Sequence, residues 1–120
     1  MAQVLVVDDS ASMRNMVMAT LSSAGHQVKD AENGETALNL AKSAKFDAVI
    51  TDLNMPVMDG ITLVKQLRAL PNYTYTPILL LTTESAGDKK SAGKEAGATG
   101  WLVKPFNPEK LLSTVDRVLG

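Results

Sequence analysis

Short, continuously apolar runs recur along this chain, and most of them end in a charged or hydroxyl-bearing residue. The runs lie at residues 4–7, 48–52, 77–82 and 99–104, with a weaker one at 27–31. Apolar runs without alternation are typical of parallel strands that are covered on both faces. Segments with helical spacing separate them, which predicts right-handed crossovers. We therefore expect an α/β fold: a three-layer, doubly wound domain with a five-stranded, mainly parallel sheet.

Helical spacing predicts helices at residues 10–24, 34–44, about 61–70, 86–96 and 107–119. The apolar residues with this spacing, which we expect on the inner faces of the helices, are Met13, Met16, Val17, Leu21, Ala37, Leu38, Ala41, Ile61, Val64, Leu67, Leu70, Leu111, Leu112, Val115 and Leu119. The helix at 86–96 differs from the others, because it holds Gly87, Gly93, three lysines and no residue more apolar than alanine. Each interior glycine costs about 1 kcal/mol relative to alanine. We expect this helix to be thinly packed and the most mobile element.

Composition is that of an ordinary globular protein and excludes several functional classes. We expect the 120 residues to form one domain, spanning 1–120. A net charge of −1 gives no overall basic surface for nucleic acid, and the lack of cysteine excludes disulfides and Cys-ligated zinc. No basic leader precedes the first apolar run, and no run reaches the roughly 18 residues of a membrane span. We expect a monomeric, cytoplasmic protein that binds neither nucleic acid nor membrane.

Polar residues stand where the predicted strands end. Asp8 and Asp9 follow the first strand, while Asp52, Thr82 and Lys104 close the third, fourth and fifth. In a parallel sheet these ends share one edge, where doubly wound folds place their sites. Taken alone, Asp52 fits a turn or a helix cap, because aspartate is common there. The convergence of three carboxylates, a hydroxyl and an ammonium group favours a functional site instead.

The residue types at this edge predict phosphoryl chemistry. Carboxylates in one cleft repel each other unless a cation joins them. Hard oxygen donors without Cys or a nearby His favour Mg²⁺, with Mn²⁺ as the alternative. Such an ion opposite Lys104 suits a phosphoryl group, whose transfer needs positioning and charge neutralisation. Asp52, ionised at neutral pH, is then a candidate nucleophile that forms an aspartyl phosphate. Thr82 is a candidate hydrogen-bond donor to a phosphoryl oxygen.

Four motifs carry a family resemblance. They are Val6-Val7-Asp8-Asp9-Ser10, Asp52-Leu53-Asn54-Met55-Pro56-Val57-Met58-Asp59-Gly60, Leu81-Thr82-Thr83-Glu84 and Lys104-Pro105-Phe106. In order and spacing they resemble a two-component receiver domain from end to end, and the chain is most similar to stand-alone chemotaxis regulators of the CheY type. The resemblance implies the sheet order 2-1-3-4-5. It also implies a signalling switch that catalyses only its own phosphotransfer and dephosphorylation, and so is not an enzyme in the classical sense.

The resemblance implies a role for each acidic residue of the site. Asp52 would be the phosphoacceptor. Asp9 and Asp52 would bind Mg²⁺ directly, Asp8 would act through water, and the main-chain carbonyl of Asn54 would complete the protein ligands.

The resemblance also implies roles for the remaining site residues. Thr82 and Lys104 would hold the phosphoryl oxygens, and the bond from Lys104 to Pro105 would be cis. Trp101 matches an aromatic position whose side chain turns inward when Thr82 moves toward the phosphate. The positions that tune dephosphorylation would be Asn54, Thr83 and Glu84.

The expected partners follow from the same resemblance. A histidine kinase, or a small donor such as acetyl phosphate, would supply the phosphoryl group. The last two helices and the last strand would act on the flagellar switch or another output protein, and a phosphatase is a further candidate partner. Three departures from the family pattern bear on this: Thr83 is larger than usual, Trp101 replaces the usual Tyr or Phe, and the helix at 86–96 is rich in lysine. The bulk of Thr83 bears on access to the phosphate, donor use and phosphate lifetime, and the size of Trp101 bears on a full inward rotamer. The lysine-rich helix weakens the case for the flagellar switch as target and leaves the phosphorylation chemistry in place.

Other functional classes stay open from the residues alone. A phosphorelay intermediate or phosphate sink would use the same site. A phosphohydrolase with an aspartyl-phosphate intermediate commonly has a second acid two residues after its nucleophile, where this chain has Asn54 and no cap domain. A flavin or nucleotide carrier would need a Gly/Ser/Thr-rich phosphate loop after the first strand, where Asp8 and Asp9 stand. A receiver cut from a transcription factor would carry a linker, and its lack in this sequence favours a stand-alone protein.

Overall fold

Five parallel strands form one sheet in the order β2-β1-β3-β4-β5. The computed structural model describes residues 2–53, 55–82, 87–104 and 107–119. The strands are β1 Gln3–Val7, β2 Gln27–Ala31, β3 Ala48–Asp52, β4 Ile78–Thr82 and β5 Gly100–Val103. This result confirms the predicted α/β fold and sheet order, including the place of the weak strand at an edge.

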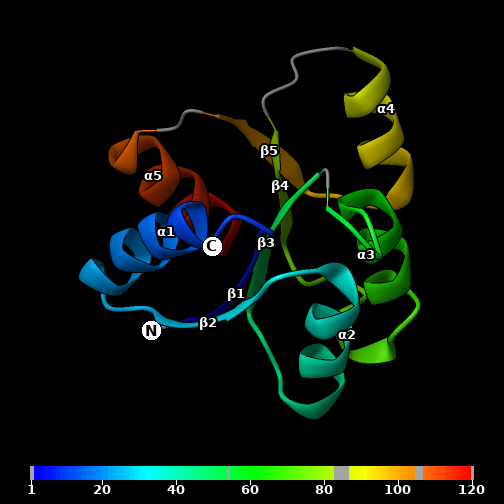
Figure 1. Cartoon of the computed structure of the whole chain (residues 1–120), viewed down its shortest axis with the longest axis horizontal. Coiled ribbons are helices and arrows are strands. Elements are labelled where there is room, and N and C mark those ends of the chain that lie inside the picture. The colour runs from blue at the N-terminus through cyan, green and yellow to red at the C-terminus, as the bar shows by residue number, and fades with distance from the viewer. Residues whose placement is uncertain (1, 54, 83–86, 105–106, 120) are drawn as a thin grey trace.

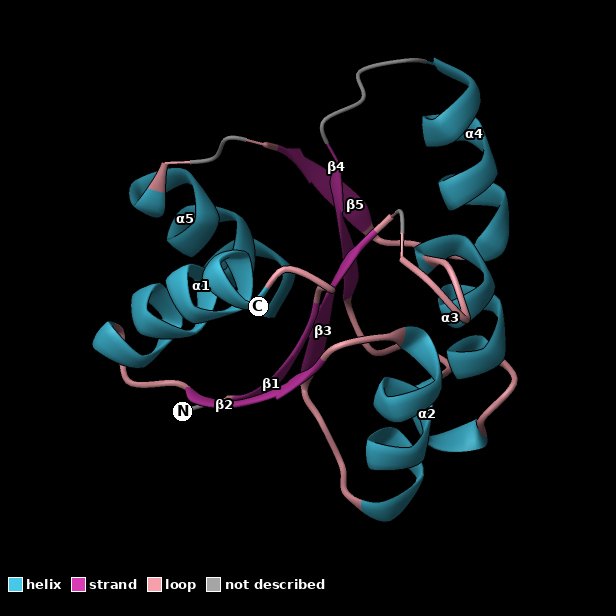
Figure 2. Ribbon diagram, viewed as in Figure 1, coloured by secondary structure: helices cyan, strands magenta, loops and turns pink. Residues whose placement is uncertain are grey.

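Helices cover both faces of the sheet, so the sheet is the middle one of three layers. They are α1 Ala11–Ser23, α2 Gly34–Ser43, α3 Gly60–Arg68, α4 Gly87–Ala96 and α5 Pro108–Leu119. α1 and α5 lie on one face, and α2, α3 and α4 lie on the other (Figures 1 and 2). The third helix was predicted to carry Leu70, but it ends at Arg68. A short 3₁₀ helix, η1 at Pro71–Tyr73, follows it.

Side-chain caps fix where four of the helices begin. In each case an oxygen of the residue before the helix accepts a hydrogen bond from a main-chain N–H in the first turn, which satisfies one of the unpaired donors there. The capping residues are Ser10, Asn33, Asp59 and Asn107. Asn107 thus caps α5, which begins at Pro108. Gly25, just beyond the end of α1, has a φ of 93°, the left-handed conformation that glycine adopts without strain.

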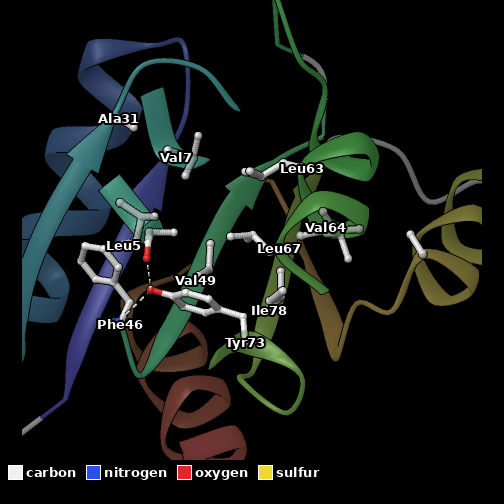
Figure 3. Close-up of a cluster of buried hydrophobic side chains, with 14 of the residues drawn as sticks. Leu5, Val7, Ala31, Phe46, Val49, Leu63, Val64, Leu67, Tyr73 and Ile78 are labelled. Atoms are coloured by element: carbon white, nitrogen blue, oxygen red, sulfur yellow. Dashed lines mark hydrogen bonds between the residues drawn. The ribbon is translucent and has the colours of Figure 1, made fainter. Parts of the chain in front are cut away.

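The core is divided by the sheet into two clusters, one under each helical layer. Tyr73 is the largest buried side chain of the cluster between the sheet and α2–α4 (Figure 3). Its hydroxyl accepts a hydrogen bond from the N–H of Phe46 at 3.2 Å, and lies 2.9 Å from the carbonyl of Ala41. The second cluster joins the opposite face of the sheet to α1 and α5 through residues such as Val17 and Leu111.

The predicted core is largely confirmed. Val17, Leu21, Ala37, Ala41, Val64, Leu67, Leu111 and Val115 are buried. Six other predicted residues are only partly buried against the clusters: Met13, Leu38, Ile61, Leu70, Leu112 and Leu119. Met16 is 53% exposed, so its expected place on an inner face is wrong. Leu63 is fully buried and was not among the predicted residues.

At Gly93, the backbone of α4 lies close to the side chain of Leu80 on β4. A Cβ atom at Gly93 would come within 2.6 Å of Cδ1 of Leu80, so the missing side chain lets the helix backbone approach the strand closely. Among the described side chains of α4, none larger than alanine is buried. The thin packing predicted for this helix is therefore observed, and its mobility stays a prediction. Within the described residues, no helix is both long and apolar enough to cross a membrane.

Candidate functional site

Five of the predicted site residues lie at one edge of the sheet, at the carboxyl ends of β1, β3, β4 and β5. Asp8 follows β1, Asp52 ends β3, Thr82 ends β4 and Lys104 follows β5. From the end of β1 the chain passes to β2 on one side of β1, whereas β3 lies on the other side of β1. The carboxylates of Asp8 and Asp52 therefore stand at the topological switch point, where doubly wound folds bind their ligands.

Three carboxylates converge at this point. Asp8, Asp9 and Asp52 each place one oxygen within 4.8 Å of the others. Asp8 is completely buried and Asp52 is 8% exposed, whereas Asp9 is exposed to solvent. The cluster thus has a closed inner side and an open outer side, through which a ligand can reach it. Three hard oxygen donors with this access are a donor set that fits Mg²⁺.

Lys104 joins two of these carboxylates. Its Nζ lies 3.0 Å from Oδ2 of Asp8 and 3.2 Å from Oδ1 of Asp52. The main-chain N–H of Lys104 donates to the carbonyl of Thr82 at 2.7 Å, which extends the β4–β5 pairing past the end of β5. The side chain is 13% exposed. Charge-assisted hydrogen bonds in such a shielded place are stronger than exposed ones.

Burial and charge shift the protonation equilibria of this group. Burial raises the pKa of Asp52 above its ordinary value, and the negative charge of Asp8 raises it further; the ammonium of Lys104 lowers it without cancelling these effects. Burial alone would lower the pKa of Lys104, but its hydrogen bond to Asp8 and the charge of Asp52 leave that pKa raised. The site therefore holds more negative charge than one lysine neutralises, which favours binding of a cation.

The loop after β3 folds tightly over the backbone of Asp52. The N–H of Leu53 donates to Oδ1 of Asp52 at 2.9 Å, and the N–H of Gly60 donates to the carbonyl of Leu53 at 2.8 Å. A Cβ atom at Gly60 would lie only 2.3 Å from the carbonyl oxygen of Asp52. Val57 in the same loop has a φ of 70° and a side chain that is 73% exposed, an uncommon conformation for a β-branched residue.

The remaining predicted residues are placed only in part. Thr82 is 4% exposed at the end of β4. Trp101 is half-buried, stands opposite Leu80 in the β4–β5 register and packs against the α2–α4 cluster. Asn54, Thr83, Glu84 and Pro105 lie outside the described residues, so their predicted roles and the cis bond stay predictions.

Two arginines with partly shielded contacts were not singled out from the sequence, Arg14 beside the acidic cluster and Arg68 at the opposite edge of the sheet. Arg14 on α1 contacts the main chain of Asp8. Arg68, at the end of α3, donates to the carbonyls of Tyr73, Thr76 and Gly97 at 2.6 to 2.9 Å, and burial lowers its pKa. No local sequence signal distinguishes these residues from solvated helix arginines, because most of their acceptors are main-chain carbonyl groups.

A doubly wound sheet with an acidic cluster and a lysine at its switch point fits the class of receiver domains. Within this class the chain belongs to the response regulator receiver domain family, whose family model matches residues 4–116. Members of this family are receivers rather than classical enzymes, so the expectation of a non-enzyme is confirmed.

The relatives include CheY chemotaxis proteins and the receiver domain of a sensor histidine kinase. A chemotaxis protein CheY homolog of Campylobacter jejuni is 41% identical, over 98% of this chain and 92% of its own length. The solved structure of chemotaxis response regulator CheY4 of Vibrio cholerae is 57% identical, with a TM-score of 0.95 over 98% of both chains. The receiver domain of the sensor histidine kinase PA1611 of Pseudomonas aeruginosa is 28% identical, with a TM-score of 0.93 over 99% of this chain and 98% of that one. Its structure has a magnesium ion coordinated in the active site cleft.

Proposed function

We propose that this chain is a phosphorylation-activated signalling switch that accepts a phosphoryl group on Asp52. The observation that carries the proposal is the pairing of Lys104 with both Asp8 and Asp52 beside the open carboxylate of Asp9. The proposed nucleophile, the proposed cation ligands and an ammonium group thereby lie together at one edge of the sheet. Phosphoryl transfer needs this combination, because positioning and charge neutralisation supply most of its catalysis.

The carboxylates are the proposed Mg²⁺ ligands. Asp9 and Asp52 would bind the ion directly, Asp8 would act through water, and the carbonyl of Asn54 would complete the set. Bound there, Mg²⁺ would neutralise the repulsion among the carboxylates and the charge of the incoming phosphoryl group. The magnesium ion in the cleft of the related PA1611 receiver domain supports this assignment.

The proposed reaction is a displacement at phosphorus. An oxygen of the Asp52 carboxylate attacks the phosphorus of a phosphohistidine on a histidine kinase, and an acyl-phosphate P–O bond forms. The P–N bond to the kinase breaks, and its electron pair leaves with the imidazole, which takes up a proton from solvent. Acetyl phosphate would react in the same way with loss of acetate. Lys104 is placed to exchange its carboxylate contacts for a phosphoryl oxygen, and the Thr82 hydroxyl would donate to another.

The proposed output lies on α4, β5 and α5. The new charge on Asp52 would draw Thr82 and Lys104 toward the phosphate, and both residues are joined to β4 and β5. Such a local electrostatic change can bias a two-state element. Trp101 would report or transmit this change, and α4 would shift because few buried side chains resist it. Similarity to CheY chemotaxis proteins supports an output in chemotaxis. We propose that the chain acts as one monomeric domain, residues 1–120, in the cytoplasm.

Phosphorylation can be tested with the purified chain and a small donor. The protein is incubated with acetyl phosphate, with and without Mg²⁺, and its intact mass is followed over time. We expect one phosphoryl group per chain, dependent on Mg²⁺ and absent from D52N. The matched variant D59N removes a carboxylate from the helix cap after β3 and should still be phosphorylated. Steady turnover of phosphate esters without a trapped adduct would contradict the receiver function and favour a phosphohydrolase.

A further inference from the structure

Arg14 lies on α1 beside the acidic cluster and contacts it through the main chain. Its Nη1 donates to the carbonyl oxygen of Asp8 at 2.7 Å, and its Nε donates to Oδ2 of Asp30 on β2 at 2.9 Å. The Arg14 side chain is 16% exposed, whereas that of Asp30 is 43% exposed. The guanidinium group is therefore held by a carboxylate on one side and presents a fixed donor to Asp8 on the other.

The oxygen that Arg14 holds belongs to the peptide group between Asp8 and Asp9. Because a peptide group is planar, fixing this oxygen also fixes the direction in which the chain enters Asp9. The N–H of Asp8 donates to the carbonyl of Ala31 at 3.1 Å. β2 thus holds this segment at two points, directly through Ala31 and indirectly through Asp30 and Arg14.

The two neighbouring carboxylates are held in different ways. The side chain of Asp8 is fixed by its own contacts, because Oδ1 accepts from the N–H of Ser10 at 2.9 Å and Oδ2 accepts from Lys104 at 3.0 Å. Asp9 is exposed, so solvent surrounds much of its side chain and its direction depends on the backbone that carries it. The peptide held by Arg14 is the last main-chain group before that residue.

We propose that Arg14 is a positioning residue for the Mg²⁺ site: it fixes the Asp8–Asp9 peptide so that the Asp9 carboxylate faces Asp52. The inference rests on the proposed function, since it presumes a cation between these carboxylates. Groups outside the ligand set that orient metal ligands commonly change metal affinity by about 10-fold or more when they are removed.

Positioning and simple charge predict opposite effects of removing Arg14. A guanidinium next to the carboxylates repels a divalent cation, so removal of its charge alone would tighten Mg²⁺ binding. Loss of the hydrogen bond to the peptide would instead weaken Mg²⁺ binding. The variant R14K separates the two effects, because lysine keeps the positive charge but lacks the planar fork that reaches Asp8 and Asp30 together.

The test is the Mg²⁺ dissociation constant, measured by isothermal titration calorimetry at constant ionic strength. We expect R14K and R14Q each to weaken binding by about 10-fold. D30N, which leaves the contact from Arg14 to Asp8 in place, should cause a smaller loss. V17A serves as the control for stability, because Val17 is buried in the same helix; it should lower thermal stability and leave the dissociation constant within about twofold of wild type.

Each outcome decides between the alternatives. If R14K binds Mg²⁺ within twofold of wild type, or if R14Q binds it more tightly, the positioning role is wrong while the Mg²⁺ site stands. If V17A weakens binding as much as R14K does, the effect belongs to stability and the positioning role is again wrong. If the wild-type chain itself binds no Mg²⁺, the proposed site and this inference both fail.

Discussion

The Nζ atom of Lys104 lies 3.2 Å from Oδ1 of Asp52, across the strand that separates β3 from β5. The lysine therefore reaches over the end of β4 to the carboxylate proposed as the nucleophile. The same ammonium group lies 3.0 Å from Asp8. Because both contacts are shielded from solvent, the ion pair holds a positive charge where a phosphoryl group would need it.

Removal of the Lys104 charge should destabilise the protein. In K104M, two buried carboxylates lose their cation, and we expect a loss of about 2–3 kcal/mol in the free energy of unfolding without Mg²⁺. Because the folded-state pKa of Lys104 is raised, its contribution is complete below the ordinary value of 10.5 and disappears as the pH rises through the folded pKa. Denaturant unfolding at several pH values measures this. A constant difference between wild type and K104M throughout the alkaline range would contradict the ion pair.

Neutralising Asp52 should stabilise the protein when no Mg²⁺ is present. The raised folded-state pKa means that ionised Asp52 opposes folding at neutral pH. D52N should therefore be more stable than wild type at pH 7. The gain should fade as the pH falls through the folded pKa of Asp52 toward its ordinary value of 3.8, where wild type is protonated as well. A D52N protein less stable than wild type at pH 7 would show that Lys104 outweighs burial and Asp8.

Mg²⁺ should make wild type more stable than D52N. An ion that binds only the folded state stabilises it by about 2.7 kcal/mol at a concentration 100 times its dissociation constant. We expect such a rise for wild type in thermal unfolding, and loss of most of it in D52N. D116N, which removes an exposed carboxylate from α5, should keep the full rise. Equal stabilisation of wild type and D52N would place the ion elsewhere.

Gly60 should tolerate no side chain, because its Cα faces the backbone of Asp52. In G60A the new Cβ would lie 2.3 Å from the carbonyl oxygen of Asp52, so the loop must shift. We expect a loss of about 1–3 kcal/mol in stability, together with weaker Mg²⁺ binding. The matched variant G100A places its Cβ at an ordinary 3.6 Å from Leu79 and should leave both quantities nearly unchanged. Similar losses in the two variants would mean that the close approach at Gly60 has no special role.

The fold and the acidic cluster could be predicted from the sequence because their signals are local. Every strand except β2 is a mainly apolar run, and Asp8, Asp9, Asp52 and Lys104 stand directly at the strand ends. The parallel arrangement alone then brings those ends to one edge, where the structure places them. The strand order itself came from the family resemblance rather than from the apolar pattern.

The contacts that could not be predicted from the sequence involve main-chain atoms or the lack of a side chain. Arg14 and Arg68 donate to carbonyl groups, which every residue has, so no partner residue marks their acceptors. Gly93 was interpreted as a cost to its helix, yet its lack of a side chain lets α4 approach Leu80 on β4. Leu70 has the helical spacing of its neighbours but lies beyond the end of α3, where Pro71 begins a 3₁₀ helix. Such features become visible only when the segments are placed together.

The central claim, that Asp52 is the phosphoacceptor, can be tested directly by locating the modified residue. The wild-type chain is treated with acetyl phosphate and Mg²⁺, the acyl phosphate is reduced with borohydride, and the peptides are mapped by mass spectrometry. Reduction converts a phosphorylated aspartate to homoserine, so the site is recorded as a stable change of mass. We predict that Asp52 alone is converted. Conversion of Asp8, Asp9 or Asp59 with Asp52 unchanged would contradict the account.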